Sequence, residues 1–221
     1  MSIPEGAVGV PADDDEDDRT RLVREGYDVL SYRYRADDAD EGEYAPWLAA
    51  LQERLPSGAA VLDVGCGCGV PVARSLAGAG FRVLGLDISE RQIERARLLV
   101  PQATFMHADA TRATFAEEAF DAVICLYSLI HMRLEAQPTF LSHVSRWLRP
   151  GGWLLATAGQ WAWTGTADNW LGGPAPMWWS HAGAADYRAW LEDAGLEIVS
   201  DGFIPEGSSG HALFWARKPA A

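Results

Sequence analysis

The chain has 221 residues, 48% of them hydrophobic, so it is long enough to bury the core of one domain without a disulfide or a metal. Its 18 Lys and Arg residues against 31 Asp and Glu residues give a net charge of −13, which disfavours DNA, RNA and anionic membranes as partners. The three cysteines form no disulfide framework, the start of the chain lacks the features of a signal peptide, and no apolar run reaches the ~20 residues of a membrane span. We therefore expect a cytoplasmic protein.

The first part of the chain divides into an acidic segment and two helices. Residues 1–18 end in the acidic run Asp13–Asp18, whose like charges repel one another, so we expect a disordered leader or, alternatively, an interaction tail. Apolar and aromatic residues then recur at helical spacing over Thr20–Tyr34 and Tyr44–Leu55. We expect these two helices, within residues 19–56, to form a helical cap in front of the main domain.

Residues 57–159 alternate between short apolar runs and helical patterns. The apolar runs predict strands at Ala60–Val64, Arg82–Leu86, Thr104–His107, Ala122–Leu126 and Trp153–Thr157. The helical patterns between them cover Val72–Ala79, Ser89–Val100 and residues 136–148. This alternation predicts an α/β fold, in which a mostly parallel sheet carries helices on both faces.

The last part of the chain departs from this rhythm before it resumes. Residues 160–183 are rich in Trp, Gly and Pro, which predicts a loop-rich insertion that acts as a substrate lid. Residues 184–221 then predict a helix over Ala184–Ala194 and two strands at Leu196–Val199 and Ala212–Ala216. With no internal repeat, residues 19–221 are expected to form a single domain.

A glycine-rich loop follows the first strand of the predicted sheet. The segment Asp63–Gly69 has the pattern D-x-G-x-G-x-G, and glycines there allow a sharp turn and the close approach of a ligand. The spacing is not the G-x-G-x-x-G of dinucleotide-binding proteins, which disfavours an NAD-dependent enzyme. The acidic residue before the loop suits a ligand with an ammonium and a sulfonium group. The alternative is a tight turn without a ligand.

Two further carboxylates follow the next two predicted strands. Asp87 is placed to accept hydrogen bonds from both hydroxyls of a ribose, unless it only caps the following helix. Asp109 is placed to bind an adenine amine while the amide of Ala110 donates to a ring nitrogen, unless it is an exposed turn residue. Because the carboxyl ends of parallel strands meet at one edge of a sheet, these groups together indicate a site for an adenosyl amino acid.

Four segments of the chain resemble motifs of the class I S-adenosylmethionine-dependent methyltransferases: Val61–Gly67, Gly85–Ser89, Phe120–Ile124 and Leu148–Gly152. The resemblance implies a Rossmann-like sheet of seven strands, with the last strand antiparallel and inserted between its neighbours. It also implies S-adenosyl-L-methionine as cofactor. The residues that it implies as cofactor contacts are Tyr34, Asp63, Gly65, Gly67, Asp87, Ile88, Gln92, Asp109, Ala110 and Leu126.

Methyl transfer from a sulfonium is an in-line displacement, for which positioning and the exclusion of water are the main requirements. An alcohol or phenol acceptor also needs a base. His131, five residues after Leu126, is our first candidate, although it is equally consistent with a packed histidine. Tyr127 is placed to contact the acceptor or the sulfonium, unless it is a core residue. His181 is a weaker candidate, as is His211.

The insertion concentrates tryptophan beside this predicted site. Trp161, Trp163, Trp170, Trp178 and Trp179, with Tyr27 from the helical cap, are expected to wall a dry pocket for an aromatic or apolar acceptor. The alternative is a lid that packs on the sheet. We expect no metal, because no carboxylate follows the fourth strand at Leu126-Tyr127 to complete a site with Asp168-Asn169.

The sequence thus predicts a methyltransferase that acts on a small molecule, with an aromatic or apolar specialised metabolite as the expected acceptor. It leaves open whether N, O or C is methylated, and it does not encode the oligomeric state. The alternative is a cyclase or binding protein on the same fold that keeps the cofactor without methyl transfer.

Overall fold

The computed structural model describes residues 16–220 of the chain. The predicted acidic leader therefore lies outside the described residues, except for its last three, Glu16–Asp18. These residues begin the first helix, because the side chain of Asp17 accepts hydrogen bonds from the amides of Arg19 and Thr20 as an N-cap. Within residues 16–220, no helix is long and apolar enough to cross a membrane.

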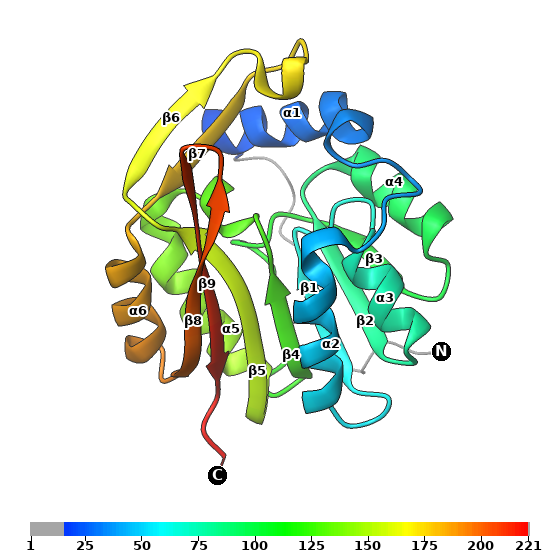
Figure 1. Ribbon diagram of the computed structural model, residues 1–221, viewed down its shortest axis with the longest axis vertical. Coiled ribbons are helices and arrows are strands. Elements are labelled where there is room, and N and C mark those ends of the chain that lie inside the picture. The colour runs from blue at the N-terminus through cyan, green and yellow to red at the C-terminus, as the bar shows by residue number, and fades with distance from the viewer. Residues whose placement is uncertain (1–15, 221) are drawn as a thin grey trace.

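A central sheet of seven strands organises the fold (Figure 1). Its strands are β1 (Ala60–Val64), β2 (Arg82–Asp87), β3 (Thr104–His107), β4 (Phe120–Cys125), β5 (Leu148–Gly159), β8 (Glu197–Glu206) and β9 (Ser209–Arg217). The order across the sheet is β3-β2-β1-β4-β5-β9-β8, and β9 runs antiparallel to both of its neighbours. The predicted Rossmann-like sheet, with its inserted antiparallel last strand, is confirmed.

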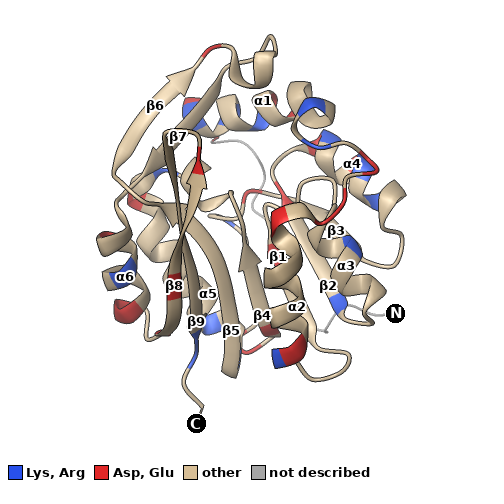
Figure 2. Ribbon diagram, viewed as in Figure 1, with Lys and Arg blue, Asp and Glu red and all other residues tan. Residues whose placement is uncertain are grey.

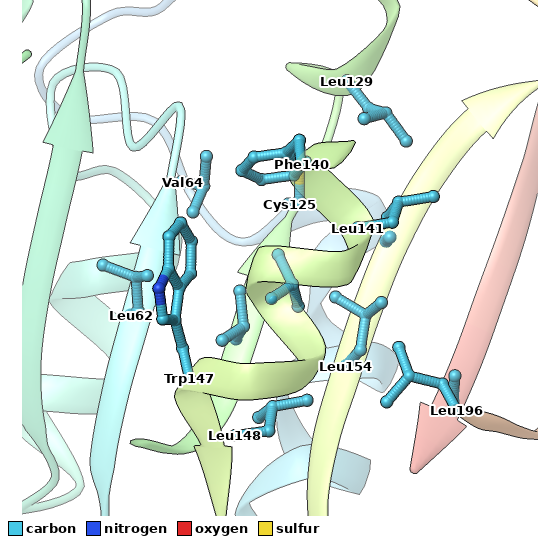
Figure 3. Packing of buried hydrophobic residues seen from close by; sticks show 14 of the residues in the cluster. Leu62, Val64, Cys125, Leu129, Phe140, Leu141, Trp147, Leu148, Leu154 and Leu196 are labelled. Atoms are coloured by element: carbon cyan, nitrogen blue, oxygen red, sulfur yellow. The ribbon is translucent and has the colours of Figure 1, made fainter. Parts of the chain in front are cut away.

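Helices cover both faces of the sheet because its central strands are apolar on both sides. All five residues of β1 are buried, as expected for a strand in the middle of a parallel sheet. One face packs on α2 (Ala45–Arg54), α3 (Val72–Gly78) and α4 (Glu90–Leu99). The other packs on α5 (Gln137–Trp147) and α6 (Ala184–Asp193). Figure 3 shows Phe140 and Trp147 of α5 lying against Leu62 and Val64 of β1.

Helix α1 (Asp18–Tyr34) lies beyond the carboxyl ends of the parallel strands (Figure 1). Its side chains contact β7 (Met177–His181) on one side, where Val23 packs with Met177 and Trp178. On the other side Ser31 donates a hydrogen bond to Oε1 of Gln92, which lies on α4. This helix therefore closes the end of the sheet at which ligands of such folds bind.

The Trp-rich insertion contains more regular structure than the sequence predicts. Strands β6 (Trp163–Ala167) and β7 form an antiparallel hairpin, with the short helix Trp170–Gly172 between them. The hydroxyls of Thr164 and Ser180, which are paired across the hairpin, lie 3.1 Å apart. The prediction of a loop-rich segment missed this hairpin, because the Gly and Pro residues around the strands mask a short alternation in β6, where Trp163, Gly165 and Ala167 share one face.

Candidate active site

Two adjoining cavities lie between α1 and the carboxyl ends of the parallel strands. The first, of about 420 Å³, is enclosed by the glycine loop, the ends of β2 and β4, and α1. The second, of about 560 Å³, lies between α1, the β6–β7 hairpin and the end of the β8–β9 hairpin. Four residues line both cavities and so form the boundary between them: Tyr27, Tyr34, Tyr127 and His131.

The structure brings nearly all of the predicted cofactor residues to the first cavity. Those that line it are Tyr34, Gly65, Gly67, Asp87, Ile88, Gln92, Asp109, Ala110 and Leu126. Asp63 lies beneath the glycine loop and lines a small adjoining cavity of about 30 Å³.

The glycine loop owes its shape to three glycines with positive φ, Gly65, Gly67 and Gly69. Gly65 and Gly67 have φ angles of 71° and 54°, a region that other residues enter only at a cost. The amide of Gly65 donates to the carbonyl of Leu86 on the neighbouring strand at 2.7 Å. A Cβ atom on Gly65 would lie 2.2 Å from Cβ of Ser128, so this turn admits no side chain.

Asp87 holds the loop and the start of α4 together. Its Oδ2 accepts a hydrogen bond from the amide of Gly67 at 2.8 Å, and its Oδ1 accepts one from the amide of Ser89 at 2.9 Å. Burial raises the pKa of Asp87 to about 6. Asp87 therefore both stabilises the start of α4 and lines the first cavity. The side chain of Ser89 caps α4 by accepting from the amide of Gln92, and the side chain of Gln92 turns to α1.

Two buried polar atoms beside the glycine loop have no partner among the described residues: Oδ2 of Asp63 and Nε2 of Gln92. Burial, with a further contribution from the charge of Asp87, raises the pKa of Asp63 to about 8. A Cβ atom on Gly67 would lie 3.9 Å from Nε2 of Gln92, so the backbone of the loop leaves space in front of this amide. An unused acceptor, an unused donor and a cavity fit a bound polar ligand such as an adenosyl amino acid.

The ends of β3 and β4 complete the first cavity. Asp109 is half-buried, and its Oδ1 accepts hydrogen bonds from the amide and the hydroxyl of Thr111, both at 2.8 Å. Leu126 follows β4, and Tyr127 after it has a φ of 58°. Such a conformation is strained for a non-glycine residue and is common at functional sites. It turns the chain away from the strand at the boundary between the two cavities.

His131 pairs with Tyr27 at this boundary. Nδ1 of His131 lies 2.7 Å from the carbonyl oxygen of Trp178, which only accepts, so this nitrogen carries the hydrogen. Nε2 then accepts from the hydroxyl of Tyr27 at 2.9 Å. Burial lowers the pKa of His131 to about 4 and raises that of Tyr27 well above its usual value. The imidazole is therefore neutral, and both of its nitrogens are engaged.

The other two predicted catalytic residues line the second cavity. The hydroxyl of Tyr127 donates to Oε1 of Glu43 at 3.0 Å, and burial and the charge of Glu43 raise the pKa of this tyrosine. Burial lowers the pKa of His181. Neither side chain is arranged as a strong base in this structure.

Aromatic side chains form the walls of the second cavity. The predicted pocket residues that line it are Tyr27, Trp161, Trp163, Trp170 and Trp179. Trp178 was also predicted, but its buried indole packs with Val23 and Met177, outside both cavities. The reason is the alternation of a strand, since Trp178 and Trp179 are neighbours on β7 and point to opposite faces.

Several lining residues come from a hairpin that sequence reasoning did not assign to the site. Glu206, Ser209 and Gly210, at the end of the β8–β9 hairpin, line the second cavity, as does His211, which was only a weak candidate. No motif marks these positions. Only the strand order, which inserts β9 beside β5, brings them to the carboxyl end of the parallel strands.

Comparisons with known proteins agree with this geometry. Residues 61–152 match a family described as methyltransferase domains. The methyltransferase GfsG of Streptomyces halstedii is 33% identical over an alignment of 157 positions that covers 60% of this chain and 56% of that protein. The chain therefore spans only a little more than half of the length of this relative.

Solved structures resemble the chain over most of its length. Magnesium protoporphyrin IX methyltransferase (ChlM) from Synechocystis PCC 6803, solved with bound SAH, gives a TM-score of 0.70 at 24% identity and covers 91% of this chain and 100% of its own. The [4+2]-cyclase SpnF gives a TM-score of 0.70 at 19% identity, covering 97% of this chain and 100% of its own. At these identities the likeness establishes the fold alone.

The sheet order, the glycine loop and the carboxylates at the strand ends define an α/β domain built to hold a nucleoside. The family match makes this assignment specific: the chain contains a methyltransferase domain of the class I, S-adenosylmethionine-dependent type.

Proposed function

We propose that the first cavity binds S-adenosyl-L-methionine and that its methyl group passes to a small-molecule acceptor in the second cavity. The observation that carries this proposal is the shared boundary of the two cavities at Tyr27, Tyr34, Tyr127 and His131. A methyl group held at this boundary faces an acceptor from the other side, as an in-line displacement requires.

The residues of the first cavity match the parts of this cofactor. Asp87 accepts hydrogen bonds from the ribose, and Asp109 with the amide of Ala110 binds the adenine. The backbone at Gly65 and Gly67, with the carbonyl of Leu126, holds the methionine end. When bound, the cofactor supplies an electrophilic methyl group on a sulfonium.

The protein mainly positions the cofactor and the acceptor and excludes water from the boundary between the two cavities. Helix α1 covers both cavities, and the ring of Tyr27 packs edge-on against those of Tyr34, His131 and Trp170, with centroids 5.2 to 5.5 Å apart. Because His131 is neutral, it places no positive charge beside a sulfonium. The packed rings exclude water from the boundary between the two cavities, whereas Trp161 and Trp163, 57% and 49% exposed, leave the far side of the second cavity open to solvent.

An aromatic or apolar specialised metabolite remains the proposed acceptor, because indole and phenol rings dominate the second cavity. A cytoplasmic location is part of the same proposal, since the three cysteines are all free thiols. The structure of SpnF is the reason to keep a second candidate function, a cyclase or binding protein that retains the cofactor, because a named cyclase has this fold.

Product analysis distinguishes the two candidates. The protein is incubated with S-adenosylmethionine carrying a labelled methyl group and with aromatic acceptors that bear hydroxyl, amine or activated carbon groups. We expect S-adenosylhomocysteine to form in equal amount to a labelled product, and Trp179→Ala to raise KM for the acceptor more than that for the cofactor. If the cofactor binds but is recovered intact with every acceptor, the transferase proposal is contradicted and the cyclase or binding role is favoured.

A further inference from the structure

Few of the described side chains that line the second cavity can carry a charge. Among the described residues that line it there is one carboxylate, Glu206, and neither a lysine nor an arginine. Three histidines also line it: His131, His181 and His211. The charge of this cavity therefore depends on whether these three imidazoles are protonated.

Two of the three histidines are held neutral by burial. Burial lowers the pKa of His131 to about 4 and also lowers the pKa of His181. Nε2 of His211 donates to Oε2 of Glu206 at 2.7 Å, whereas its buried Nδ1 has no partner among the described residues. His211 thereby fixes the position of Glu206, the one carboxylate among the described residues that line the cavity.

The walls of the cavity also favour positive charge. Indole rings of Trp161, Trp163, Trp170 and Trp179 line it, and the face of an indole attracts a cation. A second carboxylate lies close by, because Glu43 accepts the hydrogen bond of the Tyr127 hydroxyl. Figure 2 shows an acidic residue at the end of β8, where the β8–β9 hairpin lies beside β7. No described lysine or arginine lines this cavity to attract an anion; Arg35, behind its wall, lies over the ring of Tyr34 and donates to the hydroxyl of Tyr44.

We propose that the acceptor of this enzyme is an apolar or aromatic molecule that carries a protonated amine, held by the carboxylate of Glu206 and the indole rings. The inference rests on the proposed function, in which the second cavity holds the acceptor. It selects one substrate class, because acceptors that carry a carboxylate or a phosphate are excluded. The side chain of Glu206 is 72% exposed, so its attraction is moderate and weakens as salt is added.

Three indole probes of similar size test the proposal: tryptamine is a cation, 3-ethylindole is neutral and indole-3-propionate is an anion. Each is titrated calorimetrically into the protein saturated with S-adenosylhomocysteine. We expect tryptamine to bind about fivefold more tightly than 3-ethylindole, and the anion to bind most weakly. Glu206→Gln should remove most of the preference for tryptamine over 3-ethylindole, with the remainder due to the indole rings, and leave the affinity for 3-ethylindole unchanged.

Asp201→Asn is the matched control, because Asp201 is another exposed carboxylate on β8 and pairs with Arg188 away from both cavities. It should alter none of the three affinities. Equal affinities, preference for the anion, or no binding of any probe to the S-adenosylhomocysteine complex would overturn the proposal. If S-adenosylhomocysteine itself does not bind, the proposed function fails instead, so the two failures are distinguishable.

Discussion

Asp63 and Asp87 end the neighbouring strands β1 and β2, and both carboxyl groups are buried. Burial raises the pKa of Asp87 to about 6, and burial together with the charge of Asp87 raises that of Asp63 to about 8. Asp87 is partly compensated by two amides, whereas Oδ2 of Asp63 has no partner among residues 16–220. Two carboxyl groups with raised pKa values thus lie beside the glycine loop, as is common at functional sites.

This arrangement predicts that the protein loses stability as pH rises. An unfolded aspartate releases its proton near pH 3.9, whereas folded Asp63 keeps its proton to about pH 8. The folded state therefore binds more protons between these values, and the free energy of unfolding falls as pH rises through this window. From pH 5.5 to 8, Asp63→Asn should remove about 3 kcal/mol of this fall, measured by urea unfolding.

The test is the slope of the unfolding free energy against pH. An asparagine without a partner at position 63 lowers the stability equally at every pH, so it does not change this slope by itself. Asp201→Asn, at an exposed site, should keep the slope of the wild type. An equal pH dependence in Asp63→Asn and the wild type would show that Asp63 is ionised in the folded protein throughout this range.

At the level of single residues, sequence predicts the cofactor side of the site better than the acceptor side. Gly65, Gly67, Asp87 and Asp109 follow strands that hydrophobic runs reveal, so their convergence follows from the topology of a parallel sheet. Trp178 was misplaced because its orientation depends on a strand that the sequence did not reveal.

Helix α1 is the element that converts the open end of a sheet into enclosed cavities. At Gly26 it approaches β7 so closely that a Cβ atom would lie 2.8 Å from Cε of Met177 and 2.9 Å from the carbonyl oxygen of Pro176. At its other end, the buried guanidinium of Arg95 on α4 donates to the carbonyl of Ser31 at 2.8 Å. The helix is therefore held on both sides, by close packing and by hydrogen bonds.

A pair of glycine substitutions tests the close packing of α1. Alanine ordinarily stabilises a helix by about 0.5–1 kcal/mol relative to glycine. Gly78→Ala, at the end of α3 with nothing within 4 Å, should show this gain. Gly26→Ala should instead lower the free energy of unfolding by about 1–2 kcal/mol, because the methyl group displaces α1 from β7. Urea unfolding measures both, and a stabilised Gly26→Ala variant would contradict the described docking of α1.

At the level of elements, prediction succeeds where a strand is buried on both faces and fails at the exposed hairpins. The residues of β1 form a continuous apolar run, and its bounds are those predicted. Strand β8 is mostly exposed and extends to Glu206, well beyond the predicted end at Val199. Because exposed edge strands carry no clear hydrophobic period, the residues that β8 brings to the acceptor cavity were missed.

On the scale of the whole molecule, the strand order explains why residues distant in sequence share one site. The loops after β1, β2, β3 and β4 meet beneath α1, while the insertion and the β8–β9 hairpin close the other side. The net charge of −13 suits a cationic cofactor and the proposed cationic acceptor. Neither cavity is built from one segment, so its shape follows from the fold as a whole.

Calorimetric titration of S-adenosylmethionine into the wild type and into Asp87→Asn tests the central claim most directly, with Asp193→Asn, at an exposed position on α6, as the control. We expect micromolar-range binding by the wild type and the control. Asp87→Asn should weaken it by about 1.5–3 kcal/mol, since charged hydrogen bonds contribute this much. A folded wild type that binds no cofactor, or an Asp87→Asn variant that binds as tightly as the control, would contradict the site described above.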